Sequence, residues 1–232
     1  MLNECQALNV NLNPLVGKER SLIIDKLTPD VFANKIIPND IHSDTNIFAV
    51  KTRKNGDCLF GCGSVFACGK DDDLMACELR LSVVVELAIH ADYYLEEKNI
   101  EKVSKKQLHL TNLSKPMLNA MYSDKYNPSV HFDPRSIFIQ ETLHCAKQLT
   151  LAGIWQIHAL SSVLGMQIFS VYPKLGASEV SFVRKHLNRL LIPREMRSQA
   201  VGHILWCNIR SLTPMNWHPN HFAPCLPFSK KK

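Results

Sequence analysis

The amino-acid sequence predicts an α+β fold built around one hydrophobic core. The chain has 232 residues, of which 46% are hydrophobic, so it can bury a substantial core in one domain or in a small two-domain arrangement. Segments with strand and helix periodicity follow in the order strand, helices, strand, helical surface and strands, without a repeat of fixed period. We therefore expect one domain in which helices and a sheet share a core.

The first predicted unit is a strand, a tight turn and a helix. Residues 46–51 (NIFAVK) have the composition of a short strand. The next residues lead through Gly56 into the apolar-rich stretch CLFGCGSVFACG, which starts at Cys58 and predicts a helix. Cys58 is thus expected at the N-terminal end of a helix.

The longest predicted helix follows this unit. Aspartates at 71–73 form an acidic start that favours the helix dipole, and apolar residues continue at helical spacing to about Tyr94. Residues 97–121 first alternate in charge and then carry a weaker helical pattern that Pro116 breaks. We expect a variable helical insertion in this region.

The second half of the chain predicts further helices and three strands. Helical periodicity returns at Ser136, and a buried helix ends at Gly165. Strands are predicted at 166–172 and 203–208, and a final strand opens at His221 after a polar loop. The large side chains expected in the core are Trp155, Leu160, Ile168, Phe169 and Trp206.

The predicted organisation is an N-terminal arm, a main domain and a short basic tail. The arm spans residues 1–45, contains several prolines, and is expected to form a short helix near 28–34. The domain spans 46–228. The tail, 229–232, contributes part of the formal net charge of +6, which favours acidic partners only weakly.

Composition indicates an intracellular protein. The N-terminus lacks the pattern of a signal peptide, and no window is apolar for long enough to cross a membrane. The eight cysteines are spread over a chain without an export signal, so they are expected to remain reduced thiols. We expect the protein in the cytoplasm or the nucleus, with no membrane partner.

Cys58 has the sequence setting of a thiol nucleophile. The thiolate is the reactive form, and the positive end of a helix lowers the thiol pKa from its usual ~8.5. Gly56 permits a tight turn, so that amides of the 55–58 loop, which contains Asp57, can face the oxyanion of a tetrahedral intermediate. A histidine base is also required, and it can lie far away in the sequence.

Three segments resemble the signature blocks of the ovarian-tumour (OTU) family of cysteine deubiquitinases, in that family's order. They are NGDCLF at 55–60, WQIHALSSVLGMQIFSVY at 155–172 and NHFAPCL at 220–226, and the resemblance spans roughly residues 46–228. It implies a papain-like catalytic domain with a small central, mostly antiparallel sheet packed between helices.

The same resemblance implies roles for individual residues. Cys58 aligns with the nucleophile and His221 with the base, in an enzyme that hydrolyses isopeptide bonds at the C-terminus of ubiquitin without a cofactor. The partners it implies are ubiquitin or polyubiquitin chains. Trp217 and Asn220 are expected to support the site, with Trp217 as one of its walls.

The third catalytic residue departs from the family pattern. Asn55 stands where the family usually has an aspartate, Asp57 lies next to Cys58, and Ala223 stands where many members have an acid or amide. The candidates to orient the imidazole are Asn55, Asp57 and Asn220. We favour Asn55, because an asparagine fixes the histidine tautomer in other papain-like proteases.

A non-catalytic interpretation rests on a second resemblance. The predicted helix at 79–95, the 155–172 block and the HFAP strand resemble vertnin-like proteins, a group that looks like an offshoot of the OTU family. This resemblance favours a catalytically weak or inactive binding module in a regulatory or transposon-derived protein.

Two further alternatives use other side chains. A structural zinc site could take its ligands from Cys58, Cys62, His218 and His221, with Cys225 spare. A basic cluster could contact phosphates, although a solvated face is its usual interpretation and no nucleic-acid partner is expected. The cluster comprises Arg184, Lys185, His186 and Arg189.

Overall fold

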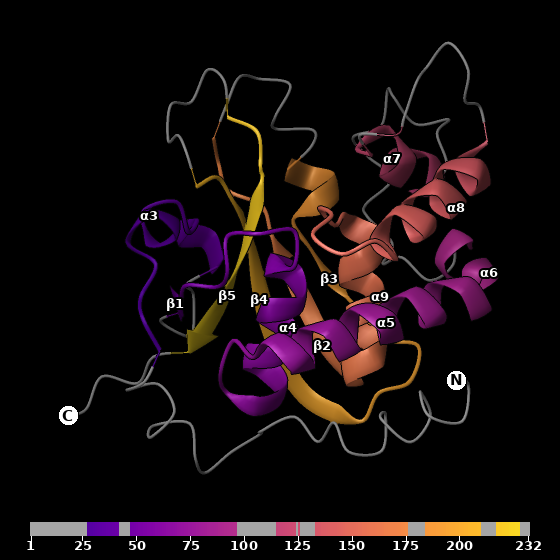
Figure 1. Cartoon of the computed structure of the whole chain (residues 1–232). Helices are drawn as coiled ribbons and strands as arrows, with labels where there is room; N and C mark the ends of the chain where they lie inside the picture. The colour runs from indigo at the N-terminus through magenta and orange to yellow at the C-terminus, as the bar shows by residue number, and fades with distance from the viewer. Residues whose placement is uncertain are drawn as a thin grey trace.

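The centre of the fold is a five-stranded sheet (Figure 1). The computed structural model describes residues 27–41, 47–96, 115–123, 125, 133–175, 184–209 and 217–227. The strands are β1 (Ile47–Ala49), β2 (Met166–Val171), β3 (Arg189–Leu191), β4 (Ser198–Cys207) and β5 (His221–Pro227), in the spatial order β1-β5-β4-β2-β3. Only β2 and β4 pair in parallel, so the sheet is mostly antiparallel, as expected.

Helices pack against this sheet and against one another. They are α3 (Val31–Asn34), α4 (Cys58–Cys68), α5 (Asp73–Ile89), α6 (Ala91–Leu95), α7 (Lys115–Met121), α8 (Pro134–Cys145) and α9 (Ile154–Leu164), with a 3-10 turn at Asn39–Ile41. Helix α4 lies against β5, α9 lies against β2, and α5 packs on both helices (Figure 1). This arrangement confirms the α+β fold class. Within the described residues, no helix is long and apolar enough to cross a membrane.

Two predicted helix boundaries are confirmed and one is wrong. Helix α4 begins at Cys58, and α9 ends where Gly165 adopts the left-handed conformation with φ of 63°. The helix predicted to reach Tyr94 ends at Ile89 instead. His90 leaves the helical conformation there, and the separate helix α6 follows.

The sequence suggested that Pro116 breaks a helix, and this prediction is wrong. Pro116 lies instead at the start of α7. A proline is tolerated in the first turn because its missing N–H would have no partner within the helix. The remainder of the predicted insertion before α7 lies outside the described residues. Strand β4 starts at Ser198, earlier than the predicted 203–208. The prediction missed its first half because those residues are partly exposed and lack a strong apolar pattern.

Most of the side chains expected in the core are buried. The buried ones are Trp155, Leu160, Ile168 and Trp206. Phe169 is only half-buried. Successive strand residues point to opposite faces of the sheet, so Phe169 faces away from the side on which its neighbour Ile168 is buried. Its ring stacks on His203, with centroids 5.9 Å apart.

Part of the predicted N-terminal arm packs into the same core. Residues 27–41 contain α3, close to the helix expected near 28–34. The Asn34 carboxamide bridges to the backbone of Ala49 through two hydrogen bonds of 2.8 and 2.9 Å. Three arm side chains are buried in the core: Ala33, Ile36 and Ile37. The basic tail at 229–232 lies outside the described residues.

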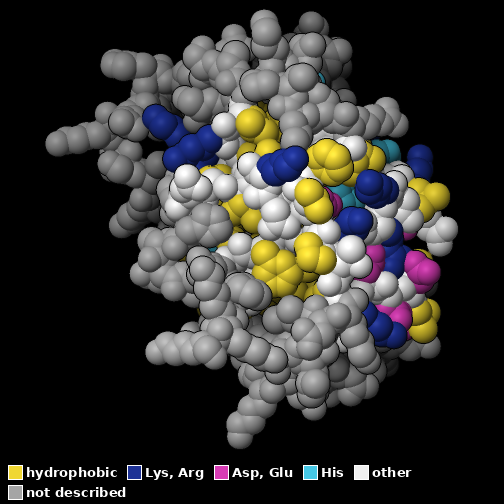
Figure 2. Space-filling model, turned by 90° about the vertical axis from the view of Figure 1, so that its left-hand side faces the viewer, with side chains coloured by type: hydrophobic (Ala, Val, Ile, Leu, Met, Phe, Trp, Pro, Cys, Tyr) yellow, Lys and Arg dark blue, Asp and Glu magenta, His cyan; other side chains and the backbone are white. Residues whose placement is uncertain are grey.

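Figure 2 shows the face of the molecule that carries α3. Val31 and Phe32 remain 60% and 57% exposed on this short helix. The Lys35 ammonium lies 5.7 Å from the centroid of the Phe32 ring, within the range of a cation–π contact. The inner side of α3 therefore belongs to the core, whereas its outer side presents apolar and basic groups to solvent.

Candidate functional site

The start of α4 lies beside the start of β5. Cys58 is the first residue of α4, and His221 is the first residue of β5. Helix α4 packs against β5, and the backbone amide of Phe222 lies close enough to the Cys58 sulfur to lower the pKa of its thiol. The fold thus brings the residues predicted as nucleophile and base into the same neighbourhood, although they are far apart in the sequence.

The electrostatic state of Cys58 differs from the expectation. Burial raises the pKa of its thiol to about 11, because only 1% of the residue is exposed and a buried thiolate loses its hydration. The backbone amides of Phe222, Leu59 and Cys58 lower this pKa, as a helix N-terminus should, and the charge of Asp57 raises it. Burial outweighs the amides, so the predicted depression of the thiol pKa is wrong for this conformation.

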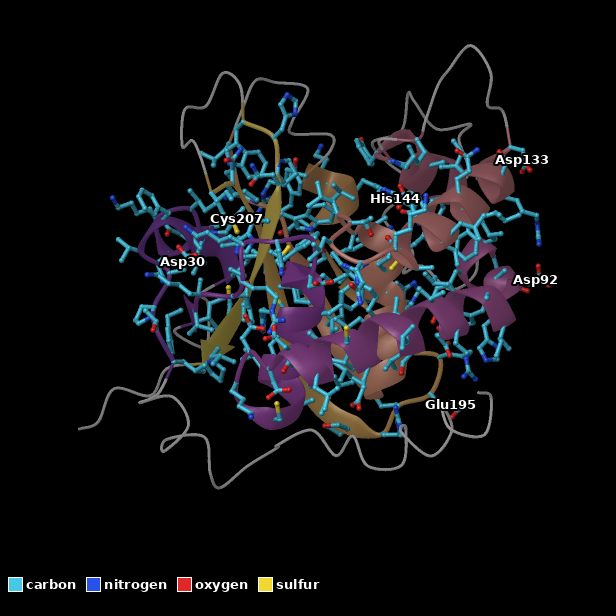
Figure 3. All side chains as sticks on the ribbon, in the orientation of Figure 1. Asp30, Asp92, Asp133, His144, Glu195 and Cys207 are labelled. Atoms are coloured by element: carbon cyan, nitrogen blue, oxygen red, sulfur yellow. The ribbon has the colours of Figure 1, made fainter. Side chains whose placement is uncertain are left out.

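The imidazole of His221 is also neutral. Burial lowers its pKa to about 4, since the charged ring would lose its hydration. The carboxylate of Asp30 opposes this shift, Lys54 adds to it, and Asp71 opposes it more weakly. Asp30 caps the N-terminus of α3 and lies near Cys207, close to the start of β5 (Figure 3).

Thr52 holds the His221 ring, a role that the sequence did not reveal. Its hydroxyl donates to the carbonyl oxygen of Phe222 (2.8 Å), and the hydroxyl oxygen of Thr52 lies 3.3 Å from His221 Nε2. Since the only hydroxyl proton goes to Phe222, Nε2 must donate to Thr52. The neutral ring therefore carries its proton on Nε2, and Nδ1 keeps the lone pair that a general base needs.

The pair of side chains is closed and uncharged in this conformation. The described hydrogen bonds do not include one between the Cys58 sulfur and the His221 ring, and both residues are at most 2% exposed. With a thiol pKa of about 11 and an imidazole pKa of about 4, transfer of the proton before the sulfur attacks a carbonyl is unfavourable. The geometry therefore suits general-base catalysis more than a preformed thiolate–imidazolium pair.

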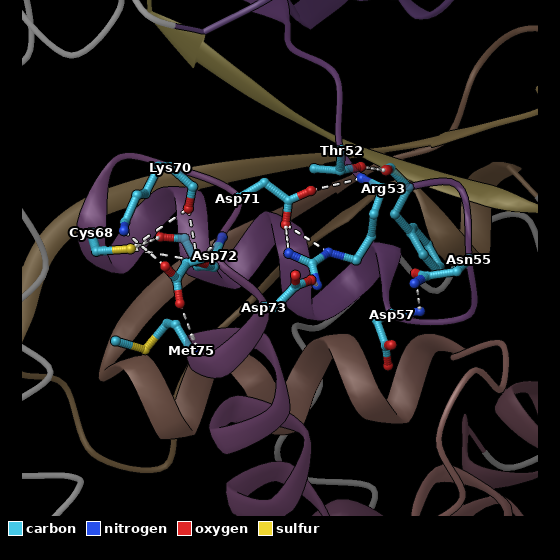
Figure 4. Close-up of polar contacts among 12 residues, drawn as sticks. Thr52, Arg53, Asn55, Asp57, Cys68, Lys70, Asp71, Asp72, Asp73 and Met75 are labelled. Atoms are coloured by element: carbon cyan, nitrogen blue, oxygen red, sulfur yellow. Dashed lines mark hydrogen bonds and ion pairs between the residues drawn. The ribbon is translucent and has the colours of Figure 1, made fainter.

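Asn55 shapes the loop before Cys58. Its side-chain oxygen accepts from the backbone N–H of Asp57 (3.0 Å, Figure 4), and its carbonyl oxygen accepts from the N–H of Cys58 (3.3 Å). The residue is exposed, and the described contacts include none to His221. We expected Asn55 to contact and orient the His221 ring. In the structure, Thr52 makes this contact instead.

Asp57 forms an ion pair with the buried guanidinium of Arg80. The carboxylate accepts from Arg80 Nη2 (2.6 Å) and Nε (2.8 Å). Arg80 also donates to the carbonyl oxygens of Gly56 and Cys145, each at 2.8 Å, and to Thr150 Oγ1 at 3.0 Å. One side chain therefore fastens the loop before Cys58 to the segment that follows α8.

Gly56 is required by a close approach of two backbones. A Cβ atom at this position would lie 1.9 Å from the carbonyl carbon of Leu149 and 2.3 Å from the nitrogen of Thr150. Leu149 itself has a positive φ of 60°, unusual for a residue with a side chain. Gly56 lies in the expected tight turn, which the N–H of Cys58 closes on the carbonyl oxygen of Asn55, and its lack of a side chain also makes room for this neighbouring loop.

A second ion pair fastens the other end of the loop. Arg53 Nε and Nη2 donate to Asp71 at 2.9 and 2.6 Å, its backbone N–H donates to the same carboxylate at 2.7 Å, and Nη1 contacts Asp73 (Figure 4). The carboxylate of Asp71 lies between α4 and α5. The loop before Cys58 is therefore held from both sides by arginine–aspartate pairs.

Asn220 and Trp217, the two residues expected to support the site, contact neighbouring loops and aromatic side chains. Asn220 donates its backbone N–H to Cys207 (3.0 Å), and its side-chain oxygen accepts from the N–H of Ile209 (3.1 Å), which closes the loop before β5. Trp217 is buried and packs edge-on against Tyr172, with centroids 5.4 Å apart. Neither residue has a described contact with the His221 ring.

The zinc alternative does not hold for the described residues. No three or more histidine, cysteine, aspartate or glutamate side chains among them are grouped so that they could hold a metal ion. The four ligands considered, together with Cys225, all lie in the described part of the chain. The buried cysteines of α4, β4 and β5 are free thiols packed among apolar neighbours.

The basic cluster is not the solvated face that the sequence suggested. Only Lys185 is well exposed. Arg184 donates to a backbone carbonyl (3.1 Å), and both His186 Nε2 and Arg189 Nη2 contact the side-chain oxygen of Asn119, at 2.9 and 3.0 Å. The cluster is thus partly turned into the molecule, toward α7.

Comparisons with known proteins identify the class of domain. A family model described as "Vertnin, OTU domain" matches residues 49–207, which include Cys58 and end before His221. This match covers more than half of the chain. The chain therefore belongs to the vertnin OTU-domain family, in agreement with both resemblances seen in the sequence.

Relatives similar in sequence to this chain include several vertnins. The vertnin of Ailuropoda melanoleuca is 27% identical over 203 residues (86% of this chain, 26% of the relative), and that of Mus musculus is 26% identical over 211 residues (86% and 25%). The vertnin of Danio rerio is 24% identical over 190 residues (76% and 24%). The chain spans about a quarter of the length of these relatives.

Two solved structures with OTU domains are also similar. The OTUD1 OTU domain has a TM-score of 0.41 and 14% identity, covering 78% of this chain and 86% of that one. The viral OTU domain protease from Farallon virus has a TM-score of 0.41 and 10% identity, covering 80% and 99%.

Proposed function

We propose that this domain is a thiol-dependent deubiquitinase, which hydrolyses isopeptide bonds at the C-terminus of ubiquitin. The observation that carries the proposal is the position of Cys58 at a helix N-terminus beside the strand that begins with His221, whose ring is held by Thr52. Membership of an OTU-domain family supports the choice of substrate, ubiquitin or polyubiquitin chains. The enzyme acts inside the cell, where its thiols stay reduced.

The reaction uses the described groups in two stages. In the first, the Cys58 thiol gives its proton to His221 Nδ1 while the sulfur attacks the carbonyl carbon of the last ubiquitin glycine. The imidazolium then protonates the departing lysine amine, which leaves a thioester. In the second stage, His221 takes a proton from water as the water oxygen attacks the thioester carbonyl. The C–S bond then breaks, ubiquitin leaves with a free C-terminal carboxylate, and the imidazolium returns its proton to the Cys58 sulfur.

Substrate binding must expose the sulfur for this reaction. Cys58 is almost completely buried, and the loop before it is held by Arg80 against the segment after α8. A segment of the substrate that enters beside this loop would have to separate the two. The proposal therefore includes a local opening before attack.

The test is covalent capture by a ubiquitin probe with a C-terminal electrophile. The wild-type chain should form the adduct, and Cys58→Ala should abolish it because the attacking sulfur is gone. Cys68→Ala is the matched control, since Cys68 is the last residue of the same helix and should not be required. A folded wild-type protein that never forms the adduct would overturn the proposal.

A second candidate function is an inactive OTU-like binding module. The closed site favours it, because a thiol whose pKa is about 11 and whose sulfur is buried is a poor nucleophile at neutral pH. Membership of the vertnin family is compatible with this role. Failure to cleave any ubiquitin linkage, together with undiminished partner binding by Cys58→Ala, would select this function over catalysis.

A further inference from the structure

Arg189 is a partly buried cation with no acid partner among the described residues. It lies on the edge strand β3, and its Nε atom is buried with no hydrogen-bond partner. In the described part of the chain, the Arg189 side chain makes one hydrogen bond, in which Nη2 donates to Asn119 Oδ1 (3.0 Å), and no carboxylate lies within ion-pair distance. Burial, with no opposing charge, lowers its pKa to about 10.

This environment is unusual for an arginine. A buried charge is normally paired with an opposite charge, and an unsatisfied buried donor usually marks a missing ion, water or ligand. Arg80 shows the ordinary pattern in the same molecule, since it pairs with Asp57 and fills its other donors with carbonyl oxygens. Among the described residues, Arg189 has no carboxylate partner, and its buried Nε has no acceptor, although Nη2 donates to Asn119 Oδ1.

Asn119 connects Arg189 to a pocket. Its side-chain oxygen accepts from both Arg189 Nη2 and His186 Nε2 (2.9 Å), so the carboxamide turns its NH₂ group away from them. Asn119 also lines a pocket of about 230 Å³ between α7, α8, the start of α9 and β4. This wall of the pocket therefore presents a hydrogen-bond donor, with a positive charge directly behind it.

The remainder of the pocket separates into apolar walls and an acidic end. Leu151, Leu187 and Trp206 supply apolar surface. Glu141 lies on α8, and its carboxylate accepts hydrogen bonds from Ser123 and from Gln156 (3.2 Å). An anion is repelled by Glu141 and attracted by Arg189, so the favourable position for negative charge is beside Asn119.

We propose that the Asn119 side of this pocket binds an oxyanion, a phosphate or carboxylate group, carried on an apolar body about as large as one amino-acid side chain. The oxyanion accepts from Asn119 Nδ2, and Arg189 supplies the compensating charge. This site goes beyond the proposed hydrolysis, because it uses none of the groups assigned to that reaction.

The first test measures thermal unfolding of the whole chain in phosphate, acetate and chloride at equal ionic strength and pH. Binding to the folded state raises the melting temperature, so phosphate or acetate should raise it saturably by about 2 °C or more above chloride. The more effective anion identifies the group that the site prefers. The absence of a saturating rise with either anion would overturn the proposal.

Two substitutions assign the effect to this site. Asn119→Asp places a carboxylate next to Arg189, so the variant should melt above the wild type in chloride and lose the anion response. Arg189→Met removes the unpaired charge, so it should lose the response without lowering the melting temperature in chloride. If Arg189→Met fails to fold, Asn119→Asp decides alone.

The control is Arg135→Met, which removes an exposed arginine that already pairs with Asp92. This variant should keep the full anion response. A response that persists in Asn119→Asp, or one that disappears in Arg135→Met, would contradict a site at Arg189. Every readout is stability, so these experiments succeed or fail independently of ubiquitin cleavage.

Discussion

At the scale of single residues, one hydroxyl decides which nitrogen of His221 can act as a base. Thr52 donates its proton to Phe222 and must accept from His221 Nε2. An asparagine side-chain oxygen would fix the same tautomer. The candidate site therefore uses a neutral acceptor to orient the ring, with the buried carboxylate of Asp30 as the charge that favours its protonation.

Replacing Thr52 tests this role. Thr52→Val keeps the shape but removes the hydroxyl, so we expect the rate of probe capture to fall about 10-fold to 100-fold and the acid limb of its pH profile to move. Thr52→Ser restores the hydroxyl and should restore both. If Thr52→Val changes only the yield of folded protein, with an unaltered rate and pH profile per folded molecule, the positioning role is wrong.

At the scale of elements, the loop between β1 and α4 is held in place by its neighbours. Arg53 binds Asp71 in front of α5, and Asp57 binds Arg80 within α5. The segment after α8 packs directly on Gly56. The position of Cys58 at the start of α4 thus depends on contacts from α5, the next helix along the chain, and from the segment after α8, which is distant in the sequence.

Gly56→Ala tests the close approach. The new methyl group would overlap the backbone of Leu149 and Thr150, which cannot rotate away as a side chain can, so we expect a loss of about 2 kcal/mol of unfolding free energy or more. Denaturant unfolding measures this loss. Gly153→Ala is the control, because its methyl group would meet side-chain atoms rather than backbone, Gln156 Oε1 at 3.3 Å and Glu141 Oε2 at 3.9 Å. Equal stability of the two variants would contradict the packing argument.

At the scale of the whole molecule, two of the described histidines are buried in their neutral form. Burial lowers the pKa of His158 and of His221 to about 4, from an ordinary value of 6.5. His158 is further constrained by a contact between Nε2 and the carbonyl oxygen of Ile192 at 2.9 Å. Both residues belong to the interior that joins the helices to the sheet.

These histidines make the stability of the domain depend on pH. Between pH 6.5 and 4 the unfolded chain binds more protons than the folded one, so the unfolding free energy should fall as pH decreases, by about 3 kcal/mol per histidine. Urea unfolding across this range measures the slope. His158→Gln should reduce the slope by the share of one histidine, and an unchanged slope would show that His158 is not buried in its neutral form.

The sequence alone determined the order of the elements apart from the short strand β3, the start of α4 at Cys58, the end of α9 at Gly165 and the start of β5 at His221. These features depend on local patterns, such as apolar periodicity and terminal glycines, that a single segment contains. The family resemblance was carried by three such local blocks, and the family match agrees with it.

Only the tertiary structure decided the roles of Thr52, Asp57 and Arg80, the close approach at Gly56, and the neutral state of Cys58 and His221. Each of these depends on which distant groups surround a side chain and on how much water they exclude. A helix N-terminus lowers a thiol pKa wherever it occurs, but burial can outweigh it, and burial is a property of the packed molecule. For that reason the sequence located the candidate site, whereas its protonation and its hydrogen bonding followed from the fold.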